Sequence, residues 1–311
     1  MTWETVLEVA KRAVISILVV INCLPTAFSA RFQNKKAEDV LLNAVITADL
    51  HTDGDITRDR NNELRKRFTA VTEKTGKTDA FILAGDLTNS GDEKEYTFLM
   101  SMLTAYTSSE KYIPAMGNHD SWHHSDDPDF GLATKYYQNF CRFCSIKSGK
   151  NYYSAKVNGY TFISLGTEAL SHNQATFSGE QLKWFDGELA KAAADNKPVF
   201  VICHQTLAGK NGTGPADDSG CIGEQSGEVE GIMKKYADDG MTILFISGHM
   251  HESVSSKSLD RRGSIYYLNL PSFQYDENEY FFLMNVYADR IVLEAAGLSE
   301  EQGKYVFEIK L

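Results

Sequence analysis

The stretch Gly117-Asn118-His119-Asp120 follows directly on the apolar run Tyr112-Ile113-Pro114-Ala115-Met116. The pattern predicts a buried strand with an amide, an imidazole and a carboxylate side by side at its C-terminal end. In open α/β sheets, ligands and catalytic groups collect outside the carboxyl ends of the strands. This stretch is therefore the first candidate for a functional site.

Four other apolar runs end in residues of the same kind. Residues 44–48 end in Asp49-Leu50-His51, residues 80–84 in Gly85-Asp86-Leu87-Thr88-Asn89, residues 199–203 in His204, and residues 243–247 in Gly248-His249-Met250-His251. Burying carboxylates and imidazoles at apolar strand ends is costly unless something compensates for the lost hydration. Because five of the eight histidines lie in these five motifs, we interpret the motifs together as a site that binds metal ions.

The first half of the chain alternates predicted strands and helices. Strands are expected at 43–48, 80–84 and 112–116, with helices at about 58–75 and 92–107 between them. Short connections between alternating strands and helices favour a mainly parallel sheet covered by helices, so the fold class is α/β.

The second half continues this pattern after a polar insert at 121–150. Asn158-Gly159 lies between two strand-like segments and is the strongest short signal for a β-hairpin. Helices are expected after Ser178 and at about 226–238, and strands at 198–203, 242–247, 264–269, 280–287, 290–296 and 304–309. The residues alone predict one mixed sheet in a single domain, residues 43–311, with a possible small cap at 121–150.

Residues 1–30 have a different composition. Lys11-Arg12 precedes an apolar run from Ala13 to Ile21, and Ala27-Phe28-Ser29-Ala30 supplies small residues for cleavage. This order is typical of a secretory signal, and the run is shorter than the roughly 20 residues that span a bilayer. We expect a signal peptide or an N-terminal membrane anchor, followed by a polar linker at 31–42. The protein is then exported, either secreted or attached to the outer face of the membrane, and cleavage, retention and lipidation at Cys23 remain alternatives.

The overall charge restricts the partners. The formal net charge is −11, and no stretch is rich in Lys or Arg. Long nucleic acids are disfavoured, because proteins that bind them carry basic surfaces. A small phosphorylated substrate is compatible, because bound metal supplies local positive charge. The sequence does not indicate an oligomeric state.

Four cysteines follow the leader, and two of them are spaced C-x-x-C. They are Cys141, Cys144, Cys203 and Cys221. A second pair that would complete a zinc site is missing from the sequence. We interpret all four as structural or incidental, although a Cys141–Cys144 or Cys203–Cys221 disulfide is conceivable in an oxidising compartment.

The order of the motifs, D-x-H, G-D, G-N-H-D, His and G-H-x-H, resembles the calcineurin-like metallophosphoesterase superfamily over nearly all of residues 43–251. The resemblance implies two packed mixed β-sheets flanked by helices, a four-layer sandwich, with a two-metal site at the strand ends. It also implies ligand sets. The first metal would be bound by Asp49, His51 and His251, the second by Asn118, His204 and His249, and Asp86 would bridge the two.

The resemblance further implies a phosphoric ester hydrolase. Two divalent or trivalent ions, with Mn, Fe or Zn most expected, would activate a hydroxide that attacks phosphorus. His119 would be the general acid, and Asp120 would orient its imidazole and raise its pKa. A purple acid phosphatase would have Tyr three residues after the bridging Asp, where this chain has Asn89.

The residues of the D-x-H and G-D-L-T-N motifs resemble those of bacterial cyclic-nucleotide phosphodiesterases more closely than those of purple acid phosphatases. A small phosphodiester is therefore the expected substrate. Alternatives are a phosphomonoesterase, a nuclease of the same superfamily or a catalytically silent metal-binding module, and metal-dependent turnover would distinguish the last of these. His123, His124, Tyr152 and Tyr153 lie near the motifs. We interpret the two histidines as exposed residues of the insert and the two tyrosines as hairpin packing.

Overall fold

A computed structural model describes residues 40–55, 57–124, 130–168, 173–213, 221–275, 280–298 and 305–311. The expected leader (1–30) and most of the linker (31–42) lie outside these described residues. Residues 39–311 form one compact unit.

The strands of this unit form two six-stranded sheets. The first sheet has the order β12 (Tyr305–Lys310), β11 (Arg290–Gly297), β10 (Tyr280–Val286), β1 (Leu42–Thr47), β2 (Thr78–Ala84) and β3 (Ser109–Ala115). The second has the order β4 (Tyr153–Val157), β5 (Tyr160–Ser164), β6 (Val199–Ile202), β7 (Ile243–Ser247), β9 (Ile265–Asn269) and β8 (Leu259–Arg262). Both sheets are mixed, because β1, β2 and β3 are parallel, as are β5, β6, β7 and β9, while the remaining neighbours are antiparallel.

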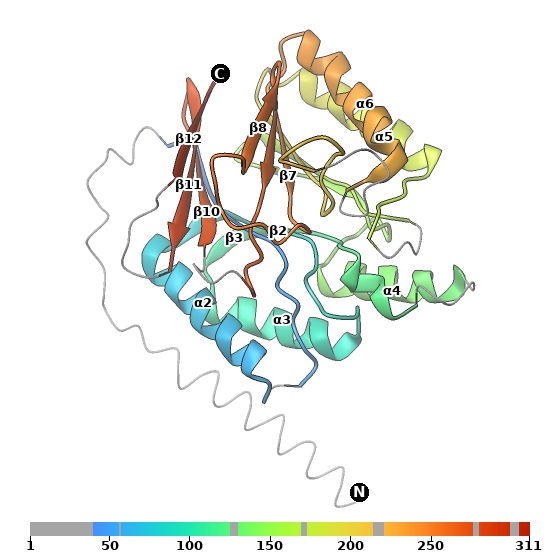
Figure 1. Cartoon of the computed structure of the whole chain (residues 1–311), viewed down its shortest axis with the longest axis vertical. Helices are drawn as coiled ribbons and strands as arrows, with labels where there is room; N and C mark the ends of the chain where they lie inside the picture. Colours follow the sequence, from blue (N-terminus) through green and yellow to red (C-terminus); the bar gives the residue numbers. More distant parts are fainter. Residues whose placement is uncertain are drawn as a thin grey trace, which may run out of the picture. The chain divides into compact units, whose positions relative to one another are not determined.

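Helices cover the outer face of each sheet (Figure 1). The first sheet packs against α2 (Asp59–Thr75), α3 (Glu93–Tyr106) and α4 (Phe130–Phe143), and the second against α5 (Gly179–Ala193) and α6 (Ser226–Asp238). Two short 3-10 helices, η2 (His119–His124) and η3 (Gly223–Gln225), lie in the connections.

The alternation of side chains along each strand builds three apolar layers. Ile46 of β1 belongs to the apolar core that also contains Phe200 and Leu244 of the second sheet. Its neighbour Val45 points the other way and packs with Phe68 of α2. The four-layer sandwich implied by the family resemblance is therefore confirmed, and the single sheet expected from the residues alone is corrected to two.

The packing of the two sheets brings the C-terminal ends of their parallel strands together. The Gly248 N–H donates to the carbonyl of His204 (2.9 Å), which joins the ends of β7 and β6. The Nδ1–H of His204 in turn donates to the carbonyl of Ala84 at the end of β2 (2.9 Å), which ties the second sheet to the first. The ends of β2, β6 and β7 therefore meet at one edge.

Other local expectations have mixed outcomes. The predicted hairpin is present, because β4 and β5 are antiparallel and Asn158 and Gly159 both have the positive φ of a tight turn. Strand β8 was not expected, since its sequence Leu-Asp-Arg-Arg is short and mostly charged. The 121–150 insert contains the end of η2 and the whole of α4, and α4 buries Tyr136 and Phe140 in the same apolar layer as α3.

The described part of the chain has no helix that is long and apolar enough to span a membrane. None of its four cysteines forms a disulfide with another, and Cys141 and Cys203 are buried. These observations agree with a structural or incidental role for the cysteines.

Candidate metal centre

Two buried carboxylates, Asp49 and Asp86, lie at the centre of the strand edge. Both side chains are almost fully buried, with 0% and 1% of the residue exposed. The chain beyond β1 runs beside the chain beyond β2, because the Asp49 N–H donates to the carbonyl of Gly85 (3.0 Å) and the His51 N–H to that of Asp86 (3.0 Å). These backbone hydrogen bonds extend the parallel pairing past the strands and place the two carboxylates next to each other.

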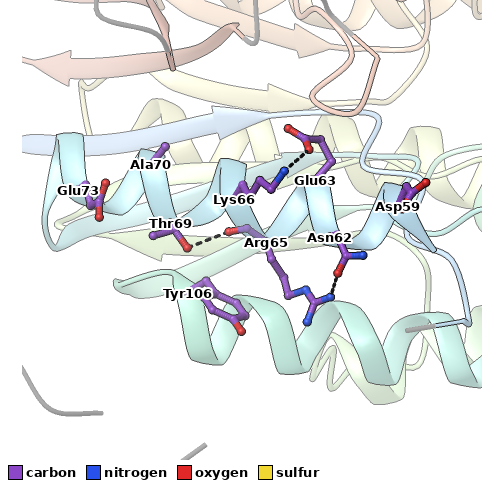
Figure 2. A pocket seen from close by; sticks show the side chains of 9 residues that line it. All are labelled: Asp59, Asn62, Glu63, Arg65, Lys66, Thr69, Ala70, Glu73 and Tyr106. Carbon is purple, nitrogen blue, oxygen red and sulfur yellow. Dashed lines mark hydrogen bonds and ion pairs between the residues drawn. The ribbon is translucent and has the colours of Figure 1, made fainter. Parts of the chain in front are cut away.

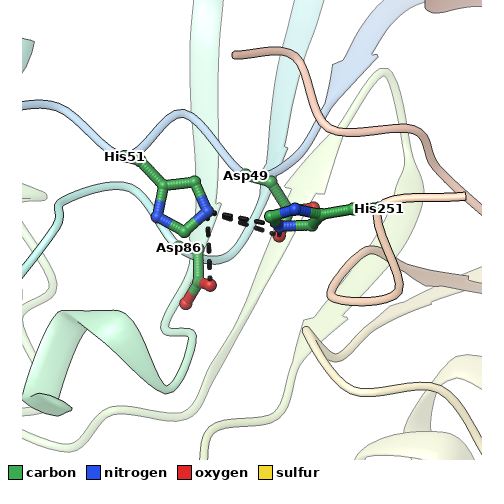
Figure 3. Close-up of side chains that lie close together, drawn as sticks. All are labelled: Asp49, His51, Asp86 and His251. Carbon is green, nitrogen blue, oxygen red and sulfur yellow. Dashed lines mark hydrogen bonds and ion pairs between the residues drawn. The ribbon is translucent and has the colours of Figure 1, made fainter. Parts of the chain in front are cut away.

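One cluster combines these carboxylates with two histidines (Figure 3). The Nε2 atoms of His51 and His251 face each other at 3.3 Å. His251 Nε2 lies 3.0 Å from Asp49 Oδ1, and His51 Nε2 lies 3.8 Å from Asp86 Oδ2. Nitrogen and oxygen atoms that converge in this way can bind one metal ion.

A second cluster consists of Asp86, His204 and His249. His204 Nε2 lies 3.1 Å from Asp86 Oδ2, and the rings of His204 and His249 are 5.0 Å apart between centroids. The carbonyl of Ala84 fixes the His204 ring by accepting from Nδ1, which leaves Nε2 directed at the carboxylates. Asp86 therefore belongs to both clusters, in the arrangement expected for a bridging ligand.

Asn118 supplies an independent test of whether these residues suit a metal. Its side-chain oxygen is buried and has no hydrogen-bond partner among the described residues. Buried polar atoms in folded proteins nearly always have a partner, so an isolated amide oxygen at this place fits a metal ligand. The residues present therefore fit the metal ions that the motifs imply.

Three glycines allow the ligands to approach one another. A Cβ atom on Gly85 would lie 2.4 Å from Cβ of His204, and one on Gly117 would lie 2.2 Å from Oδ1 of Asp86. A Cβ atom on Gly248 would lie 2.4 Å from Oδ2 of Asp49. Each of these glycines directly precedes one of the candidate ligands, so the motif glycines are required by close packing within the centre.

The backbone is also unusual at the candidate ligands. Five of them have φ values between 45° and 70°, namely Asp49, His51, Asp86, His249 and His251. Non-glycine residues rarely adopt this left-handed conformation, and clusters of such residues mark functional sites.

The pKa values reflect the closeness of the charges. Burial alone would raise the pKa of Asp49 and Asp86, but the charges and hydrogen bonds of the surrounding histidines, His204 first among them, together outweigh burial and lower both pKa values. Burial lowers the pKa of His204, but Asp86 and Asp49 outweigh this effect and raise it to about 9. For His51 burial dominates and lowers the pKa to about 4. The carboxylates are thus ionised, and His204 carries a proton in the metal-free protein at neutral pH.

His119 lies beside this centre. Its backbone N–H donates to Oδ1 of Asp86 (2.8 Å), and its ring packs edge-on against that of His51, with 4.6 Å between centroids. The Nδ1–H of His119 donates to the carbonyl of Asn89 (3.1 Å). The Asn89 carbonyl therefore orients this imidazole.

Asp120 has a different role from the one expected. Its Oδ1 accepts from the backbone N–H and the hydroxyl of Thr88 (2.9 and 2.7 Å), and its Oδ2 accepts from the N–H groups of Leu87 (3.2 Å) and Gly117 (2.8 Å). These four bonds use both carboxylate oxygens and tie the loop after β2 to the loop after β3. Burial raises the pKa of Asp120 to about 6, helped by the nearby charge of Asp86. Asp120 thus positions the loops that carry the site.

Two residues of this region were not predicted from the sequence. The ring of Tyr275 is 5.3 Å from that of His51 and 5.6 Å from that of His251, between centroids. The guanidinium of Arg60 lies over the Tyr275 ring at 5.7 Å and donates to Oδ1 of Asn89 (3.1 Å). Neither residue belongs to a motif, and no local sequence signal marks either of them.

The side chains of His123 and His124 lie outside the described residues. Tyr152 is buried and packs against Trp184 at 4.9 Å between centroids, and the Tyr153 hydroxyl donates to the carbonyl of Pro114 (2.8 Å). The expectation that these two tyrosines serve hairpin packing is confirmed.

A separate groove of about 840 Å³ lies along α2 (Figure 2). Its lining residues are Asp59, Asn62, Glu63, Arg65, Lys66, Thr69, Ala70, Glu73 and Tyr106. Several of its polar side chains bond within the groove, as Lys66 does with Glu63 (3.2 Å) and Arg65 with Asn62. None of the lining residues belongs to the motifs, so the groove is distinct from the metal centre.

The close packing at Gly248 leads to a first prediction. Gly248→Ala should weaken metal binding about tenfold or more, because its Cβ would displace the Asp49 carboxylate. Gly231→Ala is the control, since a Cβ on this glycine of α6 meets nothing within 4 Å. Metal affinity is measured by calorimetry, after thermal unfolding has shown that both metal-free variants fold. Equal metal affinities in the two variants would contradict the assignment.

A second prediction concerns protons. Since the pKa of His204 is raised to about 9, His204 carries a proton below that pH in the metal-free protein, whereas a metal requires its neutral ring. Metal binding at neutral pH should therefore release a proton, and metal affinity should rise as the pH increases towards 9. Calorimetric titrations in buffers of different ionisation enthalpy count the protons, and equal heats in all buffers would show that none is released.

The geometry agrees with comparisons to known proteins. A family model described as calcineurin-like phosphoesterase matches residues 42–253, well over half of the chain. No curated protein matches the sequence. A dimetal phosphatase from Danio rerio is 14% identical, with a TM-score of 0.60 over 88% of this chain and 99% of that one.

Two further solved structures share the fold. PhoD is 9% identical, with a TM-score of 0.61 over 86% of this chain and 69% of PhoD. A purple acid phosphatase from yellow lupin (Lupinus luteus) seeds is 14% identical, with a TM-score of 0.60 over 86% of this chain and 53% of that enzyme. Identities this low show the fold alone, whereas the family model spans all five motifs. The chain therefore belongs to the calcineurin-like phosphoesterase family, as a metal-dependent phosphoesterase.

Proposed function

We propose that the chain binds two metal ions and hydrolyses a small phosphodiester. The observation that carries this proposal is the buried Asp86 carboxylate, which is shared by two clusters of potential ligands. The first ion would be bound by Asp49, His51 and His251. The second would be bound by Asn118, His204 and His249. Asp86 would be a ligand of both ions. Nitrogen and oxygen ligands without Cys or Tyr suit Mn, Fe or Zn.

The chain's own residues would orient the substrate and move a proton. When bound, two metal ions supply a nucleophile near neutral pH and neutralise charge on the phosphate oxygens. His119 would protonate the oxygen of the leaving group. The Asn89 carbonyl supports this role, because it holds the Nδ1–H of His119 and so directs Nε2 away from Asn89. Asp86 holds the backbone of His119 at the edge of the centre.

The preference for a small diester rests on two features of the sequence. The G-D-L-T-N motif around Asp86 resembles the corresponding motif of cyclic-nucleotide phosphodiesterases. The net charge of −11 disfavours a nuclease. A phosphomonoesterase is the second candidate, since the dimetal phosphatase and purple acid phosphatase have the same fold. A catalytically silent module is the alternative without catalysis, and one solved structure with this fold is described as an anchor in the inner membrane complex of Plasmodium.

We also propose that the protein acts outside the cytoplasm. The basic, apolar and small-residue order of residues 1–30 supports export, either by secretion or by anchoring to the outer face of a membrane. Cell fractionation of a full-length tagged chain tests this proposal, and a purely cytoplasmic signal would contradict it.

Hydrolysis itself is the third prediction. The metal-free protein should gain activity on bis(p-nitrophenyl) phosphate when Mn, Zn or Fe is added, and the rate should exceed that on p-nitrophenyl phosphate. Asp86→Ala should abolish activity, because it removes the shared ligand, whereas Asp59→Ala on the surface of α2 should not. Release of nitrophenolate is measured by absorbance. Tight metal binding without turnover of either ester would favour the silent module.

A fourth prediction tests the role of His119. Loss of a general acid costs about 10²–10⁴-fold in rate when the leaving group needs a proton. His119→Ala should therefore slow alkyl phosphate esters by about this factor and nitrophenyl esters much less, because nitrophenolate leaves without protonation. The measurement compares kcat on a methyl and a nitrophenyl diester, and an equal loss on both would exclude His119 as the acid.

A further inference from the structure

Tyr275 combines exposure with contact to the metal centre. The residue is 48% exposed, although its ring is 5.3 Å from His51 and 5.6 Å from His251, two candidate ligands of the first metal. Leu41, Val306 and Leu311 are the other large apolar side chains with comparable exposure in the described part of the chain. None of these three has a ring that could stack on a ligand, and none belongs to the centre.

The position of Tyr275 is fixed by the backbone of a metal-ligand loop. The Tyr275 N–H donates to the hydroxyl of Ser272 (3.1 Å), and this hydroxyl donates to the carbonyl of Asp49 (3.2 Å). The N–H of Gln274 donates to the same carbonyl (3.2 Å). The backbone at Tyr275 is therefore tied to the backbone carbonyl of Asp49, a candidate metal ligand, and the ring lies against the candidate ligands His51 and His251.

Arg60 contributes a positive charge at the same rim. Its guanidinium lies over the Tyr275 ring at 5.7 Å and donates to Oδ1 of Asn89 (3.1 Å). Among the described residues it forms no ion pair, whereas Arg58, two positions earlier, lies within 4.0 Å of the carboxylates of Asp53 and Asp55. The charge of Arg60 is therefore available to an anionic ligand, and Asn89 connects it to His119.

We propose that Tyr275 and Arg60 form a recognition wall that selects nucleotide-type phosphate esters. A base of the ligand stacks on the exposed ring of Tyr275, while Arg60 attracts the phosphate that the metals hold. Stacking of a base on an aromatic side chain changes affinity by about tenfold or more, and Arg suits phosphate oxygens because its donors are planar and always charged. The proposal deepens the proposed function and rests on it for the place of the phosphate.

A purely structural role for this pair makes a different prediction. If Tyr275 only shielded the histidines, its replacement would weaken every phosphate ligand to the same extent. If the wall recognises a base, replacement weakens only ligands that carry one. Two ligands that differ by the base alone therefore separate the two roles.

The test measures binding of adenosine 5′-monophosphate and ribose 5-phosphate to the metal-loaded full chain by calorimetry at 5 °C. We expect the nucleotide to bind at least about tenfold more tightly than the sugar phosphate. Tyr275→Leu should bring the ratio of the two Kd values close to one, and Tyr275→Phe should preserve it. Arg60→Ala should weaken both ligands by a similar factor of about five, whereas Arg65→Ala on the same helix should weaken neither.

The recognition wall is contradicted if the wild type binds the two ligands with equal affinity or binds neither. It is also contradicted if Tyr275→Leu leaves the ratio of the two Kd values unchanged. Phosphate release is assayed in the same samples, so that hydrolysis of either ligand is detected. Because the affinity ratio can be measured without turnover, it tests the recognition wall separately from the proposed hydrolysis. If the protein shows the expected affinity ratio but hydrolyses no ester, the recognition wall is supported and the proposed hydrolysis is contradicted. If the protein hydrolyses esters but binds the two ligands with a ratio of one, the hydrolysis is supported and the wall is contradicted.

Discussion

Two carboxylates buried side by side, Asp49 and Asp86, impose the constraint on which the rest of the structure depends. In the described part of the chain, every ion pair of these two residues is with a histidine. A buried carboxylate without a compensating cation is strongly destabilising, and a neutral imidazole supplies no charge. The charge must therefore come either from protonated histidines or from metal ions. Folding, protonation and metal binding are consequently coupled in this protein.

The backbone at the strand ends follows from this constraint. Five candidate ligands adopt a left-handed φ, at a cost on the order of 1–3 kcal/mol each. The conformation is held by hydrogen bonds between loops, among them those of Asp120, which tie the loops after β2 and β3 together. Glycines at 85, 117 and 248 let these loops approach to distances that a Cβ would forbid. Metal–ligand bonds would offset this strain at the five candidate ligands.

Much of the metal centre could be predicted from the sequence, because its residues follow apolar strands that are recognisable one at a time. Six of the seven expected ligands lie in two clusters that could hold metal ions, and Asn158-Gly159 forms its hairpin. The seventh, Asn118, has a buried side-chain oxygen without a hydrogen-bond partner among the described residues. The residues alone did not reveal that the strands divide into two sheets, because the division depends on pairs far apart in the chain, such as Ile46 of β1 with Phe282 of β10 in the first sheet. Nor could they reveal the partners of Asp120. A carboxylate next to a histidine suggests a pair, but the N–H groups that it binds belong to two different loops.

The difference between local sequence motifs and contacts made only in the fold explains why the sequence indicates a reaction class more clearly than a substrate. The groups that bind metal lie at strand ends, where periodicity and glycine leave a local pattern. Arg60 lies near the start of α2, and Tyr275 lies in the segment after β9, more than two hundred residues later. Only the fold brings them together, through Asn89 on one side and the carbonyl of Asp49 on the other. Residues at such a rim can change without disturbing the buried carboxylates, because their contacts with the centre are through rings and backbone. Specificity in this architecture can therefore vary while the metal chemistry stays the same.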